Sequence, residues 1–252
     1  MLFLPLAAVA CAVGLFIGAV GIGGVLLIPA LTVLGGLDVH ASSATALFTF
    51  FFTGVLGTWL FQRYGSIDWR ISLPVCMSAV AFSFAGAVVN SMIGAPLLNK
   101  IIAIIIIAAG VYILLPTNQN KLRITPVDSF RERTVLVAIG AAAGFGSGLS
   151  GAGGPVFSVP IMLAFGFAPL TAIGVSQVLQ ITSAASGTLA NLAYGSIDFV
   201  TAAWITIFEL IGVVVGVRVA HIVNMRQLRI AAAWLCVVAG IAMFIRSLDA
   251  GL

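Results

Sequence analysis

Two glycine-rich runs offer backbone groups with which this chain could bind a ligand. The first is Gly21-Ile22-Gly23-Gly24, and the second is Gly151-Ala152-Gly153-Gly154 followed by Pro155. Glycine costs about 1 kcal/mol relative to alanine inside a helix, and proline lacks the backbone N–H, so both runs predict a helix interruption. A helix that begins after such an interruption presents free N–H groups and a partial positive charge, which suits an anion. The glycines predicted to bind substrate are Gly21, Gly23, Gly24, Gly151, Gly153 and Gly154.

Hydroxyl and amide side chains accompany the second run more than the first. Ser150 directly precedes the second run, whereas Val20 holds the equivalent place in the first. A later apolar segment, residues 170–193, carries Ser176, Gln177 and Gln180. Such groups can hydrogen-bond an oxyanion without fixed charge, and the alternative is that they only join helices to one another. The polar residues predicted to bind substrate are Thr45, Ser150, Ser176, Gln177 and Gln180.

Glu209 lies near the middle of another apolar segment, between Phe208 and Leu210. An ionisable residue at the centre of a membrane-spanning helix costs at least about 2.5–3.5 kcal/mol on insertion scales, which indicates a functional role. We predict that Glu209 is a candidate for proton coupling. The alternative is a structural ion pair with an arginine such as Arg218.

Ser150 also stands in a Gly148-Leu149-Ser150-Gly151 motif, which is typical of intramembrane serine proteases. A nucleophilic serine needs a base within hydrogen-bonding reach. His221 is the one plausible base, and it lies in a basic region at the end of a segment. We therefore keep the protease as the weaker alternative and expect that the chain is not an enzyme.

The composition requires lipid as the solvent for most of this chain. Of its 252 residues, 62% are hydrophobic and 7% are charged, and the mean hydropathy is +1.23. A soluble domain carries about 25% charged residues to maintain a solvated surface. The net charge of +4 is best explained by Lys and Arg in cytosolic loops, so we expect no nucleic-acid partner. The sequence contains no cofactor or metal motif and does not indicate an oligomeric state.

Eight apolar stretches are long enough to cross a bilayer, which takes about 20 residues. They span residues 2–34, 40–62, 70–92, 96–115, 132–166, 170–193, 198–220 and 226–246. The two stretches with the glycine runs are longer than one crossing needs, which again indicates a break inside each. The sequence therefore predicts an all-α polytopic membrane protein.

The chain contains two copies of one unit. The pentapeptide Tyr64–Asp68 (YGSID) recurs 130 residues later as Tyr194–Asp198, and five glycines recur at the same offset. The glycine pairs are Gly14/Gly144, Gly18/Gly148, Gly21/Gly151, Gly23/Gly153 and Gly24/Gly154. The predicted units are repeat 1 at residues 1–115, an inter-repeat loop at 116–131 and repeat 2 at 132–252, with four hydrophobic segments in each repeat.

The positive charges favour one relative orientation of the copies. If each broken segment crosses the membrane once, the copies are parallel, and Lys and Arg divide 7 to 4 between the two sides. If each segment turns back, the copies are inverted, and all 11 Lys and Arg except Lys100 and Arg246 fall on one side. The second division obeys the positive-inside rule better. We predict inverted repeats with both termini outside, an architecture typical of secondary transporters, with an anion channel as the alternative.

The paired Gly-x-Gly-Gly…Pro elements, Gly21 to Pro29 and Gly151 to Pro160, resemble those of the TauE/SafE family of sulfite exporters and anion transporters. The two YGSID loops strengthen the resemblance, which covers nearly the whole chain. It implies export or uptake of a small sulfur-containing anion, such as sulfite or an organosulfonate, across a bacterial inner membrane. The first run departs from the family in lacking a third glycine, and the second run has Pro155 in that place.

Overall fold

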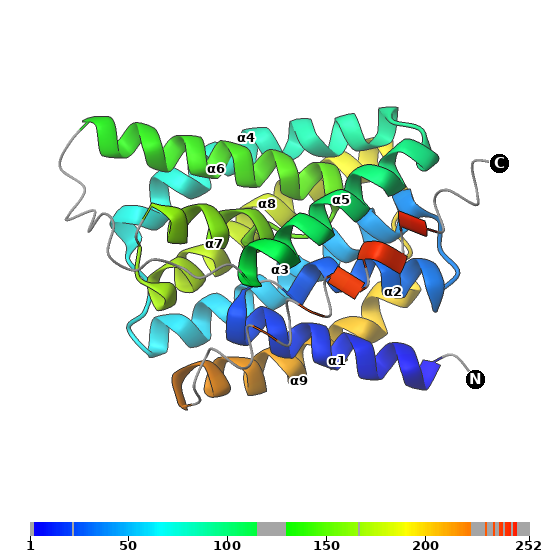
Figure 1. Cartoon of the computed structure of the whole chain (residues 1–252), viewed down its shortest axis with the longest axis horizontal. Coiled ribbons are helices and arrows are strands. Elements are labelled where there is room, and N and C mark those ends of the chain that lie inside the picture. The colour runs from blue at the N-terminus through cyan, green and yellow to red at the C-terminus, as the bar shows by residue number, and fades with distance from the viewer. Residues whose placement is uncertain are drawn as a thin grey trace.

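The computed structural model describes residues 3–21, 23–114, 130–165 and 167–222, together with scattered positions between 230 and 245. Every regular element within these residues is a helix (Figure 1). The elements are α1 (Phe3–Val20), the 3-10 helix η1 (Gly23–Leu26), α2 (Leu27–Val33), α3 (Val39–Arg63), α4 (Trp69–Met92), α5 (Ala95–Leu114), α6 (Phe130–Ser150), α7 (Pro155–Ala164), α8 (Pro169–Tyr194) and α9 (Phe199–Ile222). The all-α prediction is confirmed. The predicted loop at 116–131 and the predicted segment at 226–246 lie largely outside the described residues.

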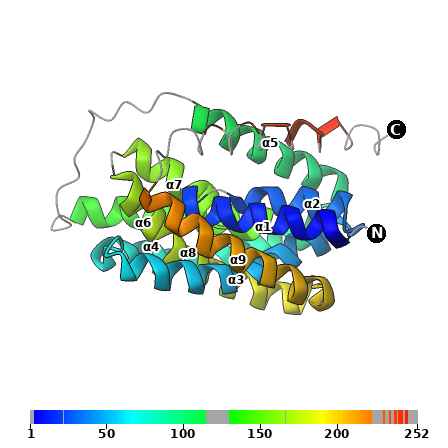
Figure 2. The ribbon, with the colours of Figure 1, turned by 90° about the horizontal axis from the view of Figure 1, so that it is seen from below.

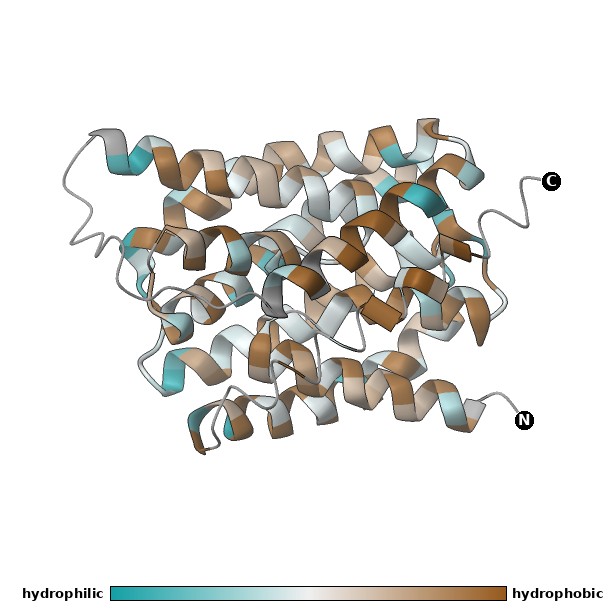
Figure 3. Ribbon diagram, in the orientation of Figure 1, coloured by the Kyte–Doolittle hydropathy of each residue, from teal (hydrophilic) through white to brown (hydrophobic). Residues whose placement is uncertain are grey.

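Five of the described helices, α3, α4, α5, α6 and α9, are long and apolar enough to cross a membrane. Helix α8 has the length, with 26 residues, but it carries several buried polar side chains, among them Gln177 and Gln180. It packs against α3, α4 and α7, so its polar residues face protein. Figure 3 shows apolar residues along the helices and hydrophilic residues gathered toward their ends.

Aspartates begin three of the long helices. Asp38 accepts hydrogen bonds from the amides of His40 and Ala41 at the start of α3, at 2.8 and 3.0 Å. Asp68 and Asp198, the last residues of the two YGSID loops, cap α4 and α9 in the same way. Such caps satisfy amides that have no partner inside the helix. The repeated pentapeptide is therefore a helix-initiation signal in both copies.

Both glycine runs interrupt their helices, as predicted. Helix α1 ends at Val20, and Gly21 follows with a φ of +79°, in the left-handed region that favours glycine. Helix α6 ends at Ser150, and Gly151 and Gly153 follow with φ values of +69° and +85°. We call residues 21–24 the first break and residues 151–154 the second break.

After each break the chain folds back along the helix that it has just left. A Cβ atom at Gly23 would lie 2.6 Å from the Ile17 amide nitrogen, so η1 packs directly on α1. A Cβ at Gly146 would lie 2.8 Å from the Phe157 ring, so α7 packs likewise on α6. In Figures 1 and 2, α2 returns toward the end of the molecule where α1 begins. Figure 1 also shows α1 and α6 running in opposite directions, whereas the inverted placement in a membrane stays a prediction.

The two halves of the chain are interlocked through their glycines. Gly14 of α1 packs against the Glu209 backbone of α9, and Gly144 of α6 packs in the same manner against Ala79 of α4. These two contacts are related by the offset of 130 residues. The pairs Gly18–Val213 and Gly148–Ser83, and Gly216–Leu15 and Gly86–Phe145, repeat the pattern. Each broken helix therefore packs on a long helix of the other half, through small residues that allow close approach.

Candidate functional site

The two breaks meet inside the protein. A Cβ atom at Gly24 would lie 2.7 Å from the carbonyl oxygen of Ala152, so the two breaks touch through their backbones. The ring of Phe50, from α3, lies against both of them. Its Cζ is 2.9 Å from that Cβ position at Gly24, and its Cδ2 is 3.3 Å from the corresponding position at Gly153. Phe50 is fully buried, so the aromatic ring packs at the junction of the two breaks.

Side chains of the second half surround the first break. A Cβ at Gly21 would lie 3.1 Å from Val159 of α7 and 3.3 Å from the Ser176 hydroxyl of α8. The side-chain amide nitrogen (Nε2) of Gln177 donates to the carbonyl oxygen of Ile17, in the last turn of α1, at 3.1 Å. The structure thus brings two predicted residues, Ser176 and Gln177, to the first break or to the turn before it.

The second break lies against both halves of the chain. A Cβ at Gly151 would lie 2.5 Å from the carbonyl oxygen of Ser43, near the start of α3. At Gly154 the corresponding atom would lie 3.2 Å from the Ser183 hydroxyl of α8 and would collide with Leu179. No side chain larger than hydrogen fits at Gly151 or Gly154 without movement of these neighbours.

The remaining predicted polar residues use their side chains within the fold. The side-chain amide nitrogen (Nε2) of Gln180 donates to the Phe50 carbonyl oxygen at 3.1 Å and to the Thr53 hydroxyl at 2.8 Å. Gln180 thus ties α8 to the turn of α3 that carries Phe50. The Thr45 hydroxyl accepts from the Asp198 amide at 3.0 Å, so it ties α3 to the second YGSID loop.

Comparison with known proteins agrees with this architecture. Residues 6–243 match the family described as sulfite exporter TauE/SafE. The chain belongs to the TauE/SafE family. The TauE/SafE chain is 26% identical to the probable membrane transporter protein YdhB of Bacillus subtilis, over 91% of this chain and 95% of the relative. It is 26% identical to the probable membrane transporter protein MJ0441 of Methanocaldococcus jannaschii, over 97% of each chain. No solved structure matches it at a significant level.

Membership in the TauE/SafE family makes this chain an integral membrane protein of a transporter family. Its closely packed breaks therefore lie in a protein of a transporter family, and their polar neighbours are candidates for contact with the solute.

The geometry at Ser150 gives the protease alternative no support. The Ser150 hydroxyl donates to the Gly146 carbonyl oxygen at 2.6 Å and accepts from the Ala152 amide at 3.2 Å. The ring of His221 is instead placed between the Ser66 hydroxyl and the Val217 carbonyl.

Glu209 is fully buried in this TauE/SafE protein, and its backbone packs against Gly14 of α1. Neither carboxylate oxygen has a hydrogen-bond partner among the described residues. Thr49 of α3 lies beside the carboxylate, but its hydroxyl donates to the Ala46 carbonyl oxygen at 2.9 Å. Arg218 is exposed and nine residues further along α9, a rise of about 13 Å, so the structure does not support the predicted ion pair.

Sequence reasoning missed three buried residues near the breaks, Phe50, Ser42 and Ser43. Phe50 gave no signal among the many apolar residues of α3. The Ser42 and Ser43 hydroxyls on α3 and the Ser158 hydroxyl on α7 are buried and have no partner among the described residues. Two adjacent serines at the start of an apolar segment were the available signal for Ser42 and Ser43.

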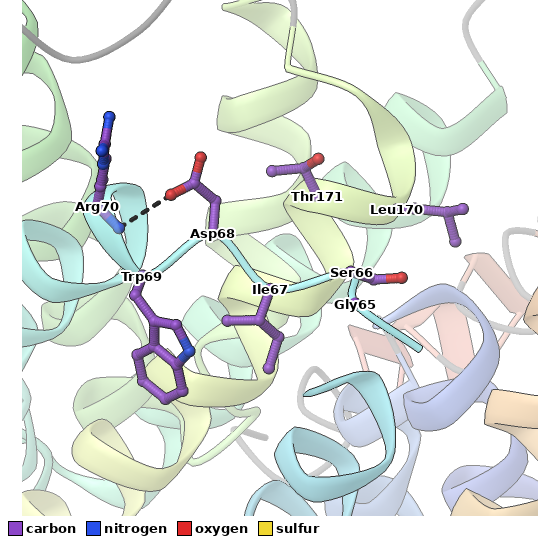
Figure 4. Close-up of a pocket in the computed structure, with 8 residues that line it drawn as sticks. All are labelled: Gly65, Ser66, Ile67, Asp68, Trp69, Arg70, Leu170 and Thr171. Carbon is purple, nitrogen blue, oxygen red and sulfur yellow. Dashed lines mark hydrogen bonds between the residues drawn. The ribbon is translucent and has the colours of Figure 1, made fainter. Parts of the chain in front are cut away.

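A surface pocket lies at the first YGSID loop, well separated along the chain from either break (Figure 4). Its volume is about 520 Å³. It is lined by Gly65, Ser66, Ile67, Asp68, Trp69, Arg70, Leu170 and Thr171. Gly174 of α8 packs against the Ser66 carbonyl oxygen, so this loop closes over the beginning of α8. The pocket is therefore a feature of the loop that caps α4 and covers the start of α8.

Proposed function

We propose that this TauE/SafE protein is a secondary transporter of a small anion, a sulfite-like sulfur oxyanion or an organosulfonate, across the bacterial inner membrane. The observation that carries the proposal is the meeting of the two breaks, where Gly24 touches Ala152 and Phe50 lies against both. Irregular backbone at membrane depth is tolerated where protein or a solute pathway surrounds it. Transporters use such interrupted helices to bind ions with helix ends.

The glycines leave the backbone amides at the breaks without a Cβ. At Gly151 the space that a Cβ would take is filled by Ser43, and at Gly154 it is filled by Leu179. An oxyanion would approach these amides when these neighbours move aside. The proposed substrate-binding residues are Gly21, Gly23, Gly24, Thr45, Ser150, Gly151, Gly153, Gly154, Ser176, Gln177 and Gln180. The Gln177 side chain bridges α8 to α1, and the Gln180 side chain bridges α8 to α3. Substrate binding would therefore replace these hydrogen bonds between helices.

Glu209 is the proposed site of proton coupling. A fully buried carboxylate without a hydrogen-bond partner is costly, and a proton relieves that cost. The Glu209 backbone packs against Gly14 of α1, so α9 links this carboxyl group to the helix that leads to the first break.

The proposed topology is a pair of inverted repeats, residues 1–115 and 132–252, joined by the loop at 116–131, with both termini outside. The opposite directions of α1 and α6 in Figure 1 support it, and so does the uneven distribution of Lys and Arg. Reporter tags on the two termini test this topology. A cytosolic tag at either end would contradict it.

Reconstitution into proteoliposomes tests the transport proposal. The expected result is saturable uptake of at least one of sulfite, thiosulfate, sulfate or an organosulfonate, accelerated by a proton gradient or by a counter-substrate. An anion channel would conduct without acceleration by either. A protease would lose peptide-bond hydrolysis in Ser150→Ala while it stays folded. Absence of both binding and uptake across the panel would overturn the anion assignment.

A further inference from the structure

Two neighbouring hydroxyls near the start of α3 are buried and unpaired. Ser42 is 0% exposed and Ser43 is 2% exposed, and neither Oγ atom has a hydrogen-bond partner among the described residues. Most buried polar groups in proteins do have a partner, from protein or from a bound molecule. The hydroxyls of Ser150 and Ser176, by contrast, donate to carbonyl oxygens of their own helices. Ser42 and Ser43 thus have donors available for a ligand.

Ser43 lies directly against the second break. A Cβ atom at Gly151 would lie 2.7 Å from the Cβ of Ser43, so the Ser43 hydroxyl, one bond further, borders the same turn. The amides of Gly153, Gly154 and Val156 form no hydrogen bond among the described residues. These amides open α7, a helix of ten residues, and carry the partial positive charge of its N-terminus. The Ser43 hydroxyl from α3, next to the unpaired Ser42 in sequence, and amide donors from α7 therefore lie beside one turn.

The donors at this turn are neutral. Among the described residues that are buried, Glu209 is the one charged side chain. His40, one turn before Ser43, is half-buried, with its Nδ1 3.2 Å from Asn90 Oδ1. The cost of moving an ion out of water rises with the square of its charge, and a site without a buried cation offsets little of it. Such a site favours a singly charged ligand over a doubly charged one.

We propose that Ser42, Ser43 and the amides that open α7 form a subsite for the oxygens of a singly charged oxyanion, and that this subsite rejects a dianion of similar shape. The proposal rests on the proposed transport function and specifies its site and its charge selectivity. The first break offers no equivalent. Gly21 faces Ser176, whose hydroxyl donates to the Ile173 carbonyl oxygen, and α2 has only seven residues.

Methanesulfonate and sulfate are suitable probes, because they are sulfur oxyanions of similar shape that carry one and two negative charges at neutral pH. Binding to the purified protein is measured by calorimetry and uptake by proteoliposome flux, both at about pH 8. The wild type is expected to bind and transport methanesulfonate and to exclude sulfate. The double variant Ser42→Ala/Ser43→Ala is expected to weaken methanesulfonate binding by about tenfold per hydroxyl, because hydrogen bonds to a charged group are among the stronger ones.

Two further variants separate binding from folding. Ser43→Thr keeps a hydroxyl and is expected to retain more affinity than Ser43→Ala. Ser72→Ala is the matched control, because Ser72 is equally buried and its hydroxyl already donates to the Asp68 carbonyl oxygen at 2.8 Å. Its affinity is expected to equal that of the wild type. If the double variant does not fold, the methanesulfonate affinities of the two single alanine variants are compared with that of the wild type instead.

Each outcome bears on a different claim. Unchanged methanesulfonate affinity in the folded alanine variants overturns the subsite. Equal binding of sulfate and methanesulfonate by the wild type overturns the charge selectivity. If the wild type neither binds nor transports any anion of the larger panel, the proposed function itself fails.

Discussion

The two breaks share a sequence motif and a reversal of the chain, but their surroundings differ. The first continues through a 3-10 helix into the seven-residue α2, and Gly21 faces side chains of Val159 and Ser176. The second leads straight into the ten-residue α7 at Pro155, and Gly151 is pressed against the Ser43 backbone. Proline suits the first position of a helix, where its missing N–H costs nothing. The duplicated motif thus keeps the same architectural role in both halves, while free donors gather at the second break.

Alanine substitution of Gly21 or Gly151, the first glycine of each break, should show the largest difference between the two halves. Gly151→Ala combines a left-handed backbone with a clash against the Ser43 backbone, so it should cost more than about 3 kcal/mol of stability and abolish transport. Gly21→Ala meets side-chain atoms that can move, so it should cost about 1–2 kcal/mol, the penalty of left-handed backbone alone. Thermal melting of the purified variants measures both. Equal losses at the two positions would mean that the breaks are equivalent.

The carboxyl group of Glu209 distinguishes the two otherwise equivalent helix contacts of the halves. Gly14 packs against Glu209 and Gly144 against Ala79, so the carboxyl group has no counterpart in the other half. Glu209→Gln should leave the fold intact, because an amide of the same shape costs less to bury than an ionised carboxylate. It should abolish the dependence of uptake on a proton gradient. The measurement is proteoliposome flux with and without an imposed pH difference, and a persistent pH dependence would remove Glu209 from the coupling mechanism.

The two YGSID loops should show the smallest difference. Asp198 accepts from the amides of Val200 and Thr201 and from the Thr201 hydroxyl, whereas Asp68 accepts from the Arg70 amide. Asp198→Ala should therefore cost about 1 kcal/mol, the usual value of a helix cap, and Asp68→Ala should cost less. Both are measured by thermal melting. A larger loss for Asp68→Ala would contradict this ranking.

Asp198 also makes the stability of the folded protein depend on pH. The Thr201 amide and hydroxyl, together with the Val200 amide, hold the pKa of Asp198 below its ordinary value of 3.8. A carboxylate with a lowered pKa stabilises the folded protein above its ordinary pKa, and that contribution is lost as the pH falls through the lowered value. Melting between pH 7 and pH 3 should show an acid-side loss of stability that is smaller in Asp198→Ala than in the wild type. An identical loss in both proteins would assign the acid sensitivity to other groups.

The sequence predicted the breaks because glycine and proline limit helices locally, whatever their surroundings. The reversal of the chain was predicted from the uneven distribution of Lys and Arg instead. The sequence also located the long helices up to residue 220, since apolar length alone identifies them. Phe50 and the serine pair Ser42–Ser43 could not be found in this way. In a membrane protein both the lipid-facing and the buried faces of a helix are apolar, so hydrophobic periodicity does not show which face of α3 turns inward. The contacts of Phe50 with both breaks depend on how α3 packs between the two halves.

The interlocked packing has a consequence for synthesis of the chain. The glycine face of α1 is covered by α9, through Gly14 with Glu209 and Gly18 with Val213. Helix α1 leaves the ribosome about two hundred residues before α9. At typical elongation rates of about 5–20 residues per second, α1 precedes its packing partner by at least about 10 s. During that interval the glycine face of α1 is open to lipid and to other helices.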